Sequence, residues 1–205
     1  MPAKNYDLHG NVPDSASIAL LFIDVINDLE FEGSEALAAQ TMAIASNLVT
    51  LRRRAKAAGI PIIYVNDNFG KWQSDFNKLI AHCLDHDVRG RPLVQLLRPD
   101  ADDYFVLKPK HSGFFSTTLD TLLAYLNART LILAGVAGNI CVLFTAHDAF
   151  MRDYHLIVPA DCVASNTPED NLYALQHIQN VLQGDIRPLA ALDWNTLQQY
   201  AEASD

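Results

Sequence analysis

The sequence is poor in cysteine, which excludes disulfide-stabilised folds and cysteine-held metal sites. Its 205 residues contain only three cysteines, Cys83, Cys141 and Cys162, an odd number at wide spacings. Such a set offers neither a disulfide framework nor a paired C-x-x-C metal motif. Unpaired thiols are typical of a reducing compartment, so we expect a cytoplasmic location.

Long apolar runs and an excess of basic residues are also missing. No apolar stretch approaches the roughly 18 residues of a membrane-spanning helix, and residues 1–15 are polar, unlike a secretory signal. The 24 acidic residues outnumber the 15 basic ones, which gives a net charge of -9. An acidic surface repels nucleic-acid backbones and anionic membranes, so we expect neither as a partner. The net charge sets no limit on a small-molecule substrate, because a local pocket can differ from the whole surface.

The chain shows no internal repeat, low-complexity tract or second-domain boundary. At this length one domain buries a sufficient core, so we expect a single domain over residues 1–205 with an N-terminal arm at 1–16. The segment 67–103 is the least regular part and holds one expected helix, which suits a lid or a pocket wall.

Apolar patterns along the chain predict an α/β fold. Near-continuous apolar runs predict buried strands, and apolar residues three and four apart predict helices. The two patterns alternate, with strands expected at 17–23, 61–65, 104–107, 130–136, 155–159 and around Ile186, and helices at 34–58, 74–84, 117–127, 139–153, 168–182 and 193–201. Alternation of this kind predicts a parallel sheet with helices on both faces.

Three reactive side chains stand at the carboxyl ends of expected strands. Asp24 follows the first strand, Lys108 follows the third, and Cys141 lies just inside the helix after the fourth. Ligands bind beyond the carboxyl ends of an open α/β sheet, so these groups are expected to share one crevice. Backbone N–H groups at a helix start, together with Lys108, would lower the pKa of Cys141 and favour its thiolate. An acid, an amine and a thiol so placed predict a cysteine-nucleophile hydrolase.

Each of the three groups also has an ordinary structural interpretation. An acid after a strand often caps a loop, and a lysine at a strand end is usually solvated. A lone cysteine on an apolar helix is more often an inert core residue than a nucleophile. Spacing alone leaves both interpretations open.

Separated sequence blocks resemble the isochorismatase-like cysteine hydrolases. They are LFIDVIND at 21–28, KPKHSGFFST at 108–117, GVAGNICV at 135–142 and TAHDA at 145–149. The resemblance covers about residues 17 to 190 and comes in the family's order. It implies a three-layer α/β/α fold around a six-stranded parallel sheet.

The same resemblance implies roles for particular residues. Asp24, Lys108 and Cys141 match the family's catalytic triad. A non-proline cis peptide would fall between Val136 and Ala137. The backbone N–H groups of Ala137 and Cys141 would then be the oxyanion donors.

The sequence departs from nicotinamidase-type relatives near the aspartate. Those relatives carry a glutamine two residues after it and an aromatic residue three residues later, where this chain has Ile26 and Leu29. These two positions are candidate substrate-binding residues. Trp72 and Phe114 are further candidates as pocket walls, although both fit an ordinary core equally well.

No metal or other cofactor is expected. The metal-binding branch of the family carries histidines soon after the aspartate that follows the second strand. Asp67 stands in that place, but residues 68–72 contain no histidine. His82 and His86 are spaced like zinc ligands on a helix, but without a third ligand motif nearby we interpret them as surface or core-edge residues.

The leading functional prediction is hydrolysis of a C–N bond in a small amide, carbamoyl or ureido compound through a thioester on Cys141. One alternative within the family is vinyl-ether hydrolysis of isochorismate, which needs no thiol. Another is a non-catalytic relative that acts as a binding or scaffold protein. By analogy with the family, a homo-oligomer, either a dimer or a tetramer, is expected.

Overall fold

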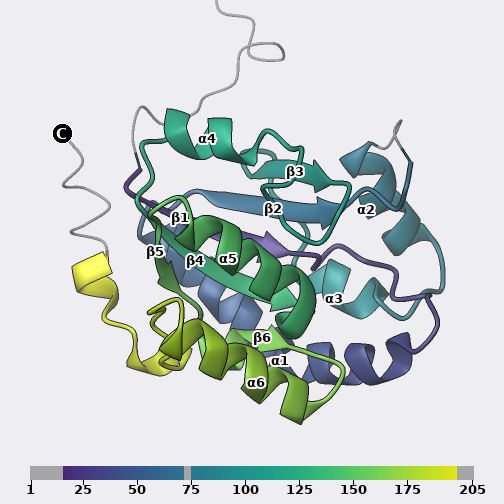
Figure 1. Cartoon of the computed structure of the whole chain (residues 1–205). Coiled ribbons are helices and arrows are strands. Elements are labelled where there is room, and N and C mark those ends of the chain that lie inside the picture. Colours follow the sequence, from purple (N-terminus) through teal and green to yellow (C-terminus); the bar gives the residue numbers. More distant parts are fainter. Residues whose placement is uncertain (1–15, 72–74, 198–205) are drawn as a thin grey trace, which may run out of the picture.

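The structure, a computed structural model, describes residues 16–71 and 75–197. Its centre is a sheet of β1 (Ile18–Ile23), β2 (Ile62–Asp67), β3 (Tyr104–Lys108), β4 (Thr130–Val136), β5 (His155–Ile157) and β6 (Val163–Ala164). The strands lie in the order β3-β2-β1-β4-β5, β6 also pairs with β4, and every pairing is parallel (Figure 1). Every residue of β1 is buried, as the near-continuous apolar run predicts. The predicted six-stranded parallel sheet is confirmed.

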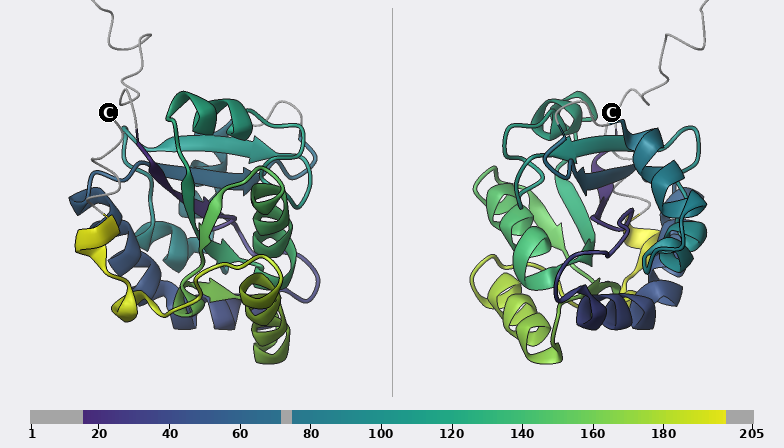
Figure 2. Two further views of the ribbon diagram at one scale, coloured as in Figure 1. Left: turned by 60° about the vertical axis from the view of Figure 1, so that its left-hand side comes forward. Right: turned by 90° about the vertical axis from the view of Figure 1, so that its right-hand side faces the viewer.

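Helices cover both faces of the sheet (Figure 2). One face carries α1 (Ser34–Ala57), α2 (Phe76–Asp85) and α3 (Arg91–Leu96), and the other carries α4 (Leu119–Tyr125), α5 (Leu143–Phe150) and α6 (Pro168–Asn180). Successive side chains of a strand point to opposite faces. Along β1, Leu20 and Phe22 therefore enter the core under α1, while Leu21 and Ile23 enter the core under α5. The sheet and the helices on its two faces form the three layers, with one core between each pair of neighbouring layers.

The sixth strand lies elsewhere than predicted. β5 pairs only with the first part of β4, which leaves the last two residues of β4 to pair with β6. The expected strand around Ile186 is wrong, because this stretch contributes only an isolated bridge between Asp185 and Ile157. A strand as short as β6 is too short to show an alternating or continuous apolar pattern.

Two further differences concern helices. The segment 67–103 holds α3 in addition to the predicted α2, and six residues are too few to show a helical period. The last predicted helix begins at Trp194, and its part beyond residue 197 lies outside the described residues. Within the described ranges, no helix combines the length and apolarity that a membrane span requires.

The strand order reverses at the centre of the sheet. β1 and β4 are neighbours, and the chain proceeds outward from β1 to β2 and β3 but from β4 to β5. A crevice outside the carboxyl ends of such strands is the usual ligand site of open α/β sheets. The turns that follow β1 and β4 are therefore where functional side chains are expected.

Candidate active site

The structure brings together the three reactive groups that the sequence singled out. Lys108 is the last residue of β3, Asp24 directly follows β1, and Cys141 lies in the turn after β4. The Nζ atom of Lys108 is 2.9 Å from Oδ2 of Asp24 and 3.5 Å from Sγ of Cys141. The lysine thus bridges the carboxylate and the thiol.

Burial of Lys108 and Asp24 distinguishes this arrangement from an ordinary surface ion pair. Lys108 is fully buried and Asp24 is 5% exposed. Charged side chains are almost never buried unless they are paired. The ordinary interpretation of Lys108 as a solvated lysine is therefore wrong.

Asp67, the last residue of β2, is a site residue that sequence reasoning considered only as a metal ligand. Its backbone N–H donates to Oδ1 of Asp24 at 2.7 Å, and its carboxylate lies 3.8 Å from Nζ of Lys108. Asp24 itself adopts a left-handed backbone conformation with φ 51°, which is uncommon outside glycine, asparagine and aspartate. The positive φ and the Asp67 contact together fix the direction of the Asp24 carboxylate.

A close approach of β4 to β1 precedes the turn that carries the thiol. Gly135 has φ 120°, and a Cβ atom there would lie 2.1 Å from the carbonyl oxygen of Ile23. Only glycine fits this position. The peptide bond between Val136 and Ala137 is cis, at the position that the resemblance implies.

Cys141 lies in a π-helical turn, Gly138–Val142, that runs directly into α5. Thr145 secures this turn, since its hydroxyl donates to the Cys141 carbonyl at 2.7 Å and accepts from the Gly113 N–H at 3.0 Å. On the other side, the Asn139 N–H donates to the Ser165 hydroxyl at 3.1 Å. The turn is thereby tied both to the loop after β3 and to the segment before α6.

The electrostatics of the site differ from the sequence-based expectation. Burial and the Asp24 charge raise the pKa of Cys141 to about 12, and the opposing effect of Lys108 is smaller. Lys108 lowers the pKa of this thiol as predicted, but the prediction of a net lowering is wrong, because residue types do not reveal burial. Burial also raises the pKa of Asp24 against the opposing charge of Lys108. Burial alone would lower the pKa of Lys108, but the charges of Asp24 and Cys141 raise it.

The raised pKa values of Cys141 and Asp24 have a chemical consequence. A thiol with a pKa near 12 is protonated at neutral pH. A sulfur nucleophile in this site therefore needs a base beside it to take its proton. Asp24 contacts the thiol, and burial raises the pKa of its carboxyl above the usual value, which makes it a better proton acceptor than an ordinary aspartate.

His111 is a third polar neighbour of the thiol, after Lys108 and Asp24, and the sequence patterns indicated no role for it. Its Nδ1 atom is 3.9 Å from Sγ of Cys141, and its ring centroid is 5.5 Å from that of Phe144 on α5. The imidazole is exposed. Its place in the loop after Lys108 was the only signal, because spacing cannot tell where a loop side chain points.

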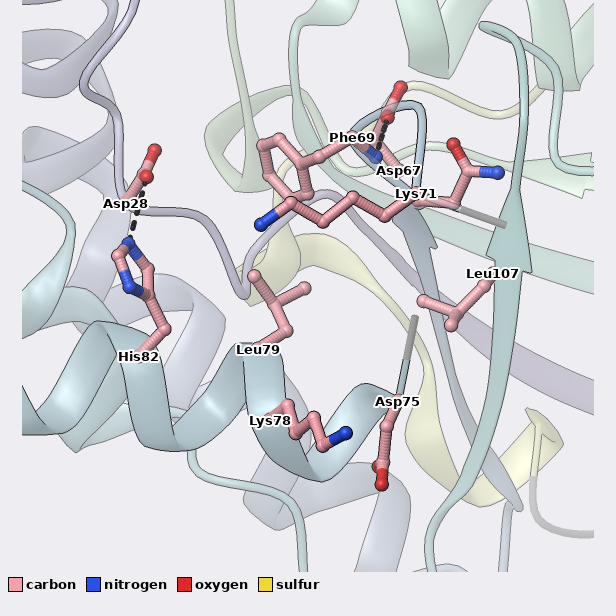
Figure 3. Close-up of a pocket in the computed structure, with 10 residues that line it drawn as sticks. Asp28, Asp67, Phe69, Lys71, Asp75, Lys78, Leu79, His82 and Leu107 are labelled. Atoms are coloured by element: carbon pink, nitrogen blue, oxygen red, sulfur yellow. Dashed lines mark hydrogen bonds and ion pairs between the residues drawn. The ribbon is translucent and has the colours of Figure 1, made fainter. Parts of the chain in front are cut away.

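A cavity of about 680 Å³ borders the site at Asp67 (Figure 3). Figure 3 shows Leu79 on α2 pointing toward Phe69 and Lys71, while His82 on the same helix points toward Asp28. The lining is rich in charged groups and consists of Asp28, Asp67, Asn68, Phe69, Lys71, Asp75, Lys78, Leu79, His82 and Leu107. The space is large enough for a small molecule, and its walls combine charged and apolar side chains, with Asp24, Lys108 and Cys141 beyond the lining.

Comparison with known proteins decides the family. The Isochorismatase domain family matches residues 18–185. The chain belongs to the isochorismatase family. YaaI of Bacillus subtilis, an uncharacterized isochorismatase family protein, is 45% identical over 171 residues, which cover 83% of this chain and 93% of YaaI.

Two further relatives of this isochorismatase-family chain have names that state an activity. The ureidoacrylate amidohydrolase RutB of Yersinia enterocolitica is 30% identical over 182 residues, covering 77% of this chain and 79% of RutB. The crystal structure of N-carbamoylsarcosine amidase from Thermoplasma acidophilum has a TM-score of 0.67 at 25% identity, covering 86% of this chain and 99% of that one. The family therefore consists of hydrolases that include enzymes acting on amides.

The candidate substrate-binding residues of this isochorismatase-family chain that the structure describes, Ile26, Leu29 and Phe114, do not line the cavity. Ile26 is fully buried in the core under α1. Leu29 is 1% exposed and packs with Val136 and Ala137, and Phe114 belongs to the core on the other face. Trp72 lies outside the described residues. A substrate contact for these positions stays a prediction.

The residues that could hold a metal ion have other partners in the structure. Nε2 of His82 is 3.2 Å from Oδ2 of Asp28, and Nδ1 of His86 is 2.9 Å from the His82 carbonyl oxygen. In the described part of the chain, one group of three possible ligands lies close together, namely Asp100, Asp102 and Asp103. Lys56 forms ion pairs with all three of these aspartates.

Proposed function

We propose that this chain hydrolyses a C–N bond in a small amide, carbamoyl or ureido compound, with Cys141 as nucleophile. The observation that carries the proposal is the contact of one buried ammonium, that of Lys108, with both Asp24 and Cys141. A thiol held between a base and a cation in this way fits nucleophilic catalysis better than a structural role.

The proposed reaction begins with transfer of the Cys141 proton to Asp24 as the sulfur attacks the carbonyl carbon. Lys108 keeps the Asp24 carboxylate in place and offsets the negative charge that develops on sulfur. The backbone N–H groups of Ala137 and Cys141 are the proposed donors to the tetrahedral oxyanion. Ammonia or an amine leaves, and water then hydrolyses the thioester.

The substrate class rests on the cavity and on the relatives. The charged lining beside Asp67 suits a molecule that carries polar groups in addition to its reacting carbonyl. RutB is named a ureidoacrylate amidohydrolase and the Thermoplasma protein an N-carbamoylsarcosine amidase, which favours ureido and carbamoyl compounds. The cytoplasmic location, the single domain and the homo-oligomeric state stay predictions.

The experiment is a screen for ammonia release with nicotinamide, ureidoacrylate, N-carbamoylsarcosine and related small amides. Cys141→Ala is expected to abolish turnover of any substrate found, because no other group replaces the sulfur. Cys162→Ala is the matched control and should keep turnover, since Cys162 is a buried core residue.

Isochorismate belongs in the same screen. Its vinyl-ether hydrolysis proceeds by protonation of an alkene and needs no thiol. Pyruvate release that persists in Cys141→Ala would overturn the proposal in favour of this alternative. Normal ammonia release by Cys141→Ala would refute covalent catalysis.

A further inference from the structure

We infer that His111 is a second proton-transfer group, which serves the open side of the Cys141 sulfur while Asp24 serves the buried side. This inference rests on the proposed function. It starts from the asymmetry around the sulfur atom. Asp24 and Lys108 are buried, whereas His111 is exposed with its Nδ1 3.9 Å from Sγ.

Substrate and water must reach the sulfur from the side that is open to solvent. The leaving nitrogen and the attacking water therefore face His111 rather than Lys108. Histidine can donate and accept a proton near neutral pH. In a structure without substrate, catalytic hydrogen bonds are often long, so 3.9 Å is compatible with a role in proton transfer.

The structure also holds the His111 loop against the nucleophile. The next residue, Ser112, donates from its hydroxyl to the carboxylate of Asp148 on α5 and accepts from the Phe114 N–H at 3.1 Å. Thr145 joins Gly113 of the same loop to the Cys141 carbonyl. Both anchors come from α5, the helix that continues the Cys141 turn, so the loop that carries the imidazole and the turn that carries the thiol are held by the same helix.

Proton counting explains why a second group is useful. During acylation Asp24 takes the thiol proton, and the His111 imidazolium gives its proton to the leaving nitrogen as the C–N bond breaks. Asp24 is then protonated and cannot accept another proton. Neutral His111 takes a proton from the water that attacks the thioester. The departing sulfur recovers its proton from Asp24, so both groups return to their starting states.

The test separates the two half-reactions with p-nitrophenyl acetate. Its p-nitrophenolate leaves without needing a proton, so acylation does not require His111. Deacylation does, because water must be deprotonated. For His111→Gln we expect p-nitrophenolate release with enzyme in excess to stay within about 3-fold of the unsubstituted protein. We expect decay of the acetyl thioester, followed by mass spectrometry after acid quench, to slow by at least about 10-fold.

The matched control is His155→Gln, an exposed histidine at the start of β5, which should change neither rate. An unchanged thioester decay in His111→Gln would overturn the inference and show that Asp24 serves both steps. An equal loss in both rates would also overturn it, because it would indicate a structural role. Acetylation that persists in Cys141→Ala would instead count against the proposed function.

Discussion

Lys108 is the residue on which the charges of the site depend. As the only group of the three that is fully buried, it needs the Asp24 carboxylate as its partner. Burial and the charge of the same carboxylate raise the pKa of the neighbouring thiol to about 12, so the resting site holds a protonated sulfur. In the proposed mechanism, Asp24 delays ionisation of Cys141 until the sulfur attacks and then accepts its proton. Replacing Asp24 by asparagine should therefore make ionisation of the thiol easier but slow turnover.

Asp24→Asn should lower the pKa of Cys141, because the negative charge is lost while the Lys108 ammonium stays. A neighbouring charge in contact with an ionisable group changes its pKa by about one unit or more. The midpoint of the pH dependence of iodoacetamide alkylation at Cys141 should therefore fall below that of the unsubstituted protein.

Amide hydrolysis by Asp24→Asn should fall by about 10²- to 10⁴-fold, since the base is gone. Asp87→Asn, a change of an exposed aspartate beyond α2, is the control and should alter neither property. An alkylation midpoint that stays the same or rises in Asp24→Asn would contradict the assigned charges.

At the scale of elements, the sequence predicted the strands well and the short pieces poorly. β1 and β4 are continuous apolar runs because both of their faces are covered, and that pattern is visible without a structure. β6 and α3 are too short to carry a period. The approach of the strand ends that joins Asp24 to Lys108 was expected from topology. The loop contact of His111 was not, because loop paths depend on contacts distant in sequence.

The link from α5 to the loop after β3 gives a prediction at this scale. Thr145→Val keeps the side-chain shape but leaves the Gly113 N–H without its acceptor in a buried place. The free energy of unfolding, measured with urea, should fall by about 1–3 kcal/mol.

Thr50→Val is the matched control for this change. The Thr50 hydroxyl makes the same kind of bond to a carbonyl four residues earlier, that of Ser46, but at an exposed place on α1. The loss in Thr50→Val should be smaller. Equal losses in both variants would show that the bridge to Gly113 contributes nothing.

At the scale of the whole molecule, formation of the site depends on the pairing of strands that are distant in sequence. Three of its charged groups come from the ends of β1, β2 and β3, so these three strands must be paired before Asp24, Asp67 and Lys108 meet. Sequence patterns predicted that Asp24 and Lys108 would meet, but not that Asp67 would join them. They also could not predict the burial of the site or the resulting rise in the pKa of Cys141. Those properties belong to the packed molecule.

Lys108→Met should destabilise the whole protein, because it leaves Asp24 buried without its cation. Removing one partner of a buried ion pair costs about 3–5 kcal/mol. The double variant Asp24→Asn/Lys108→Met should recover most of that loss, since no unpaired charge is left. Urea unfolding of the two single variants and the double variant measures this coupling. Additive losses would mean that the two side chains do not act as a pair.

The most direct test of covalent catalysis at Cys141 is mass spectrometry of the protein after brief reaction with p-nitrophenyl acetate and acid quench. We predict one acetyl group per chain, on the peptide that contains Cys141, and its disappearance when the unquenched protein is left in buffer. Acetylation at Cys83, at Cys162 or at lysines in place of Cys141, or release of p-nitrophenol with no acetylated protein, would contradict it.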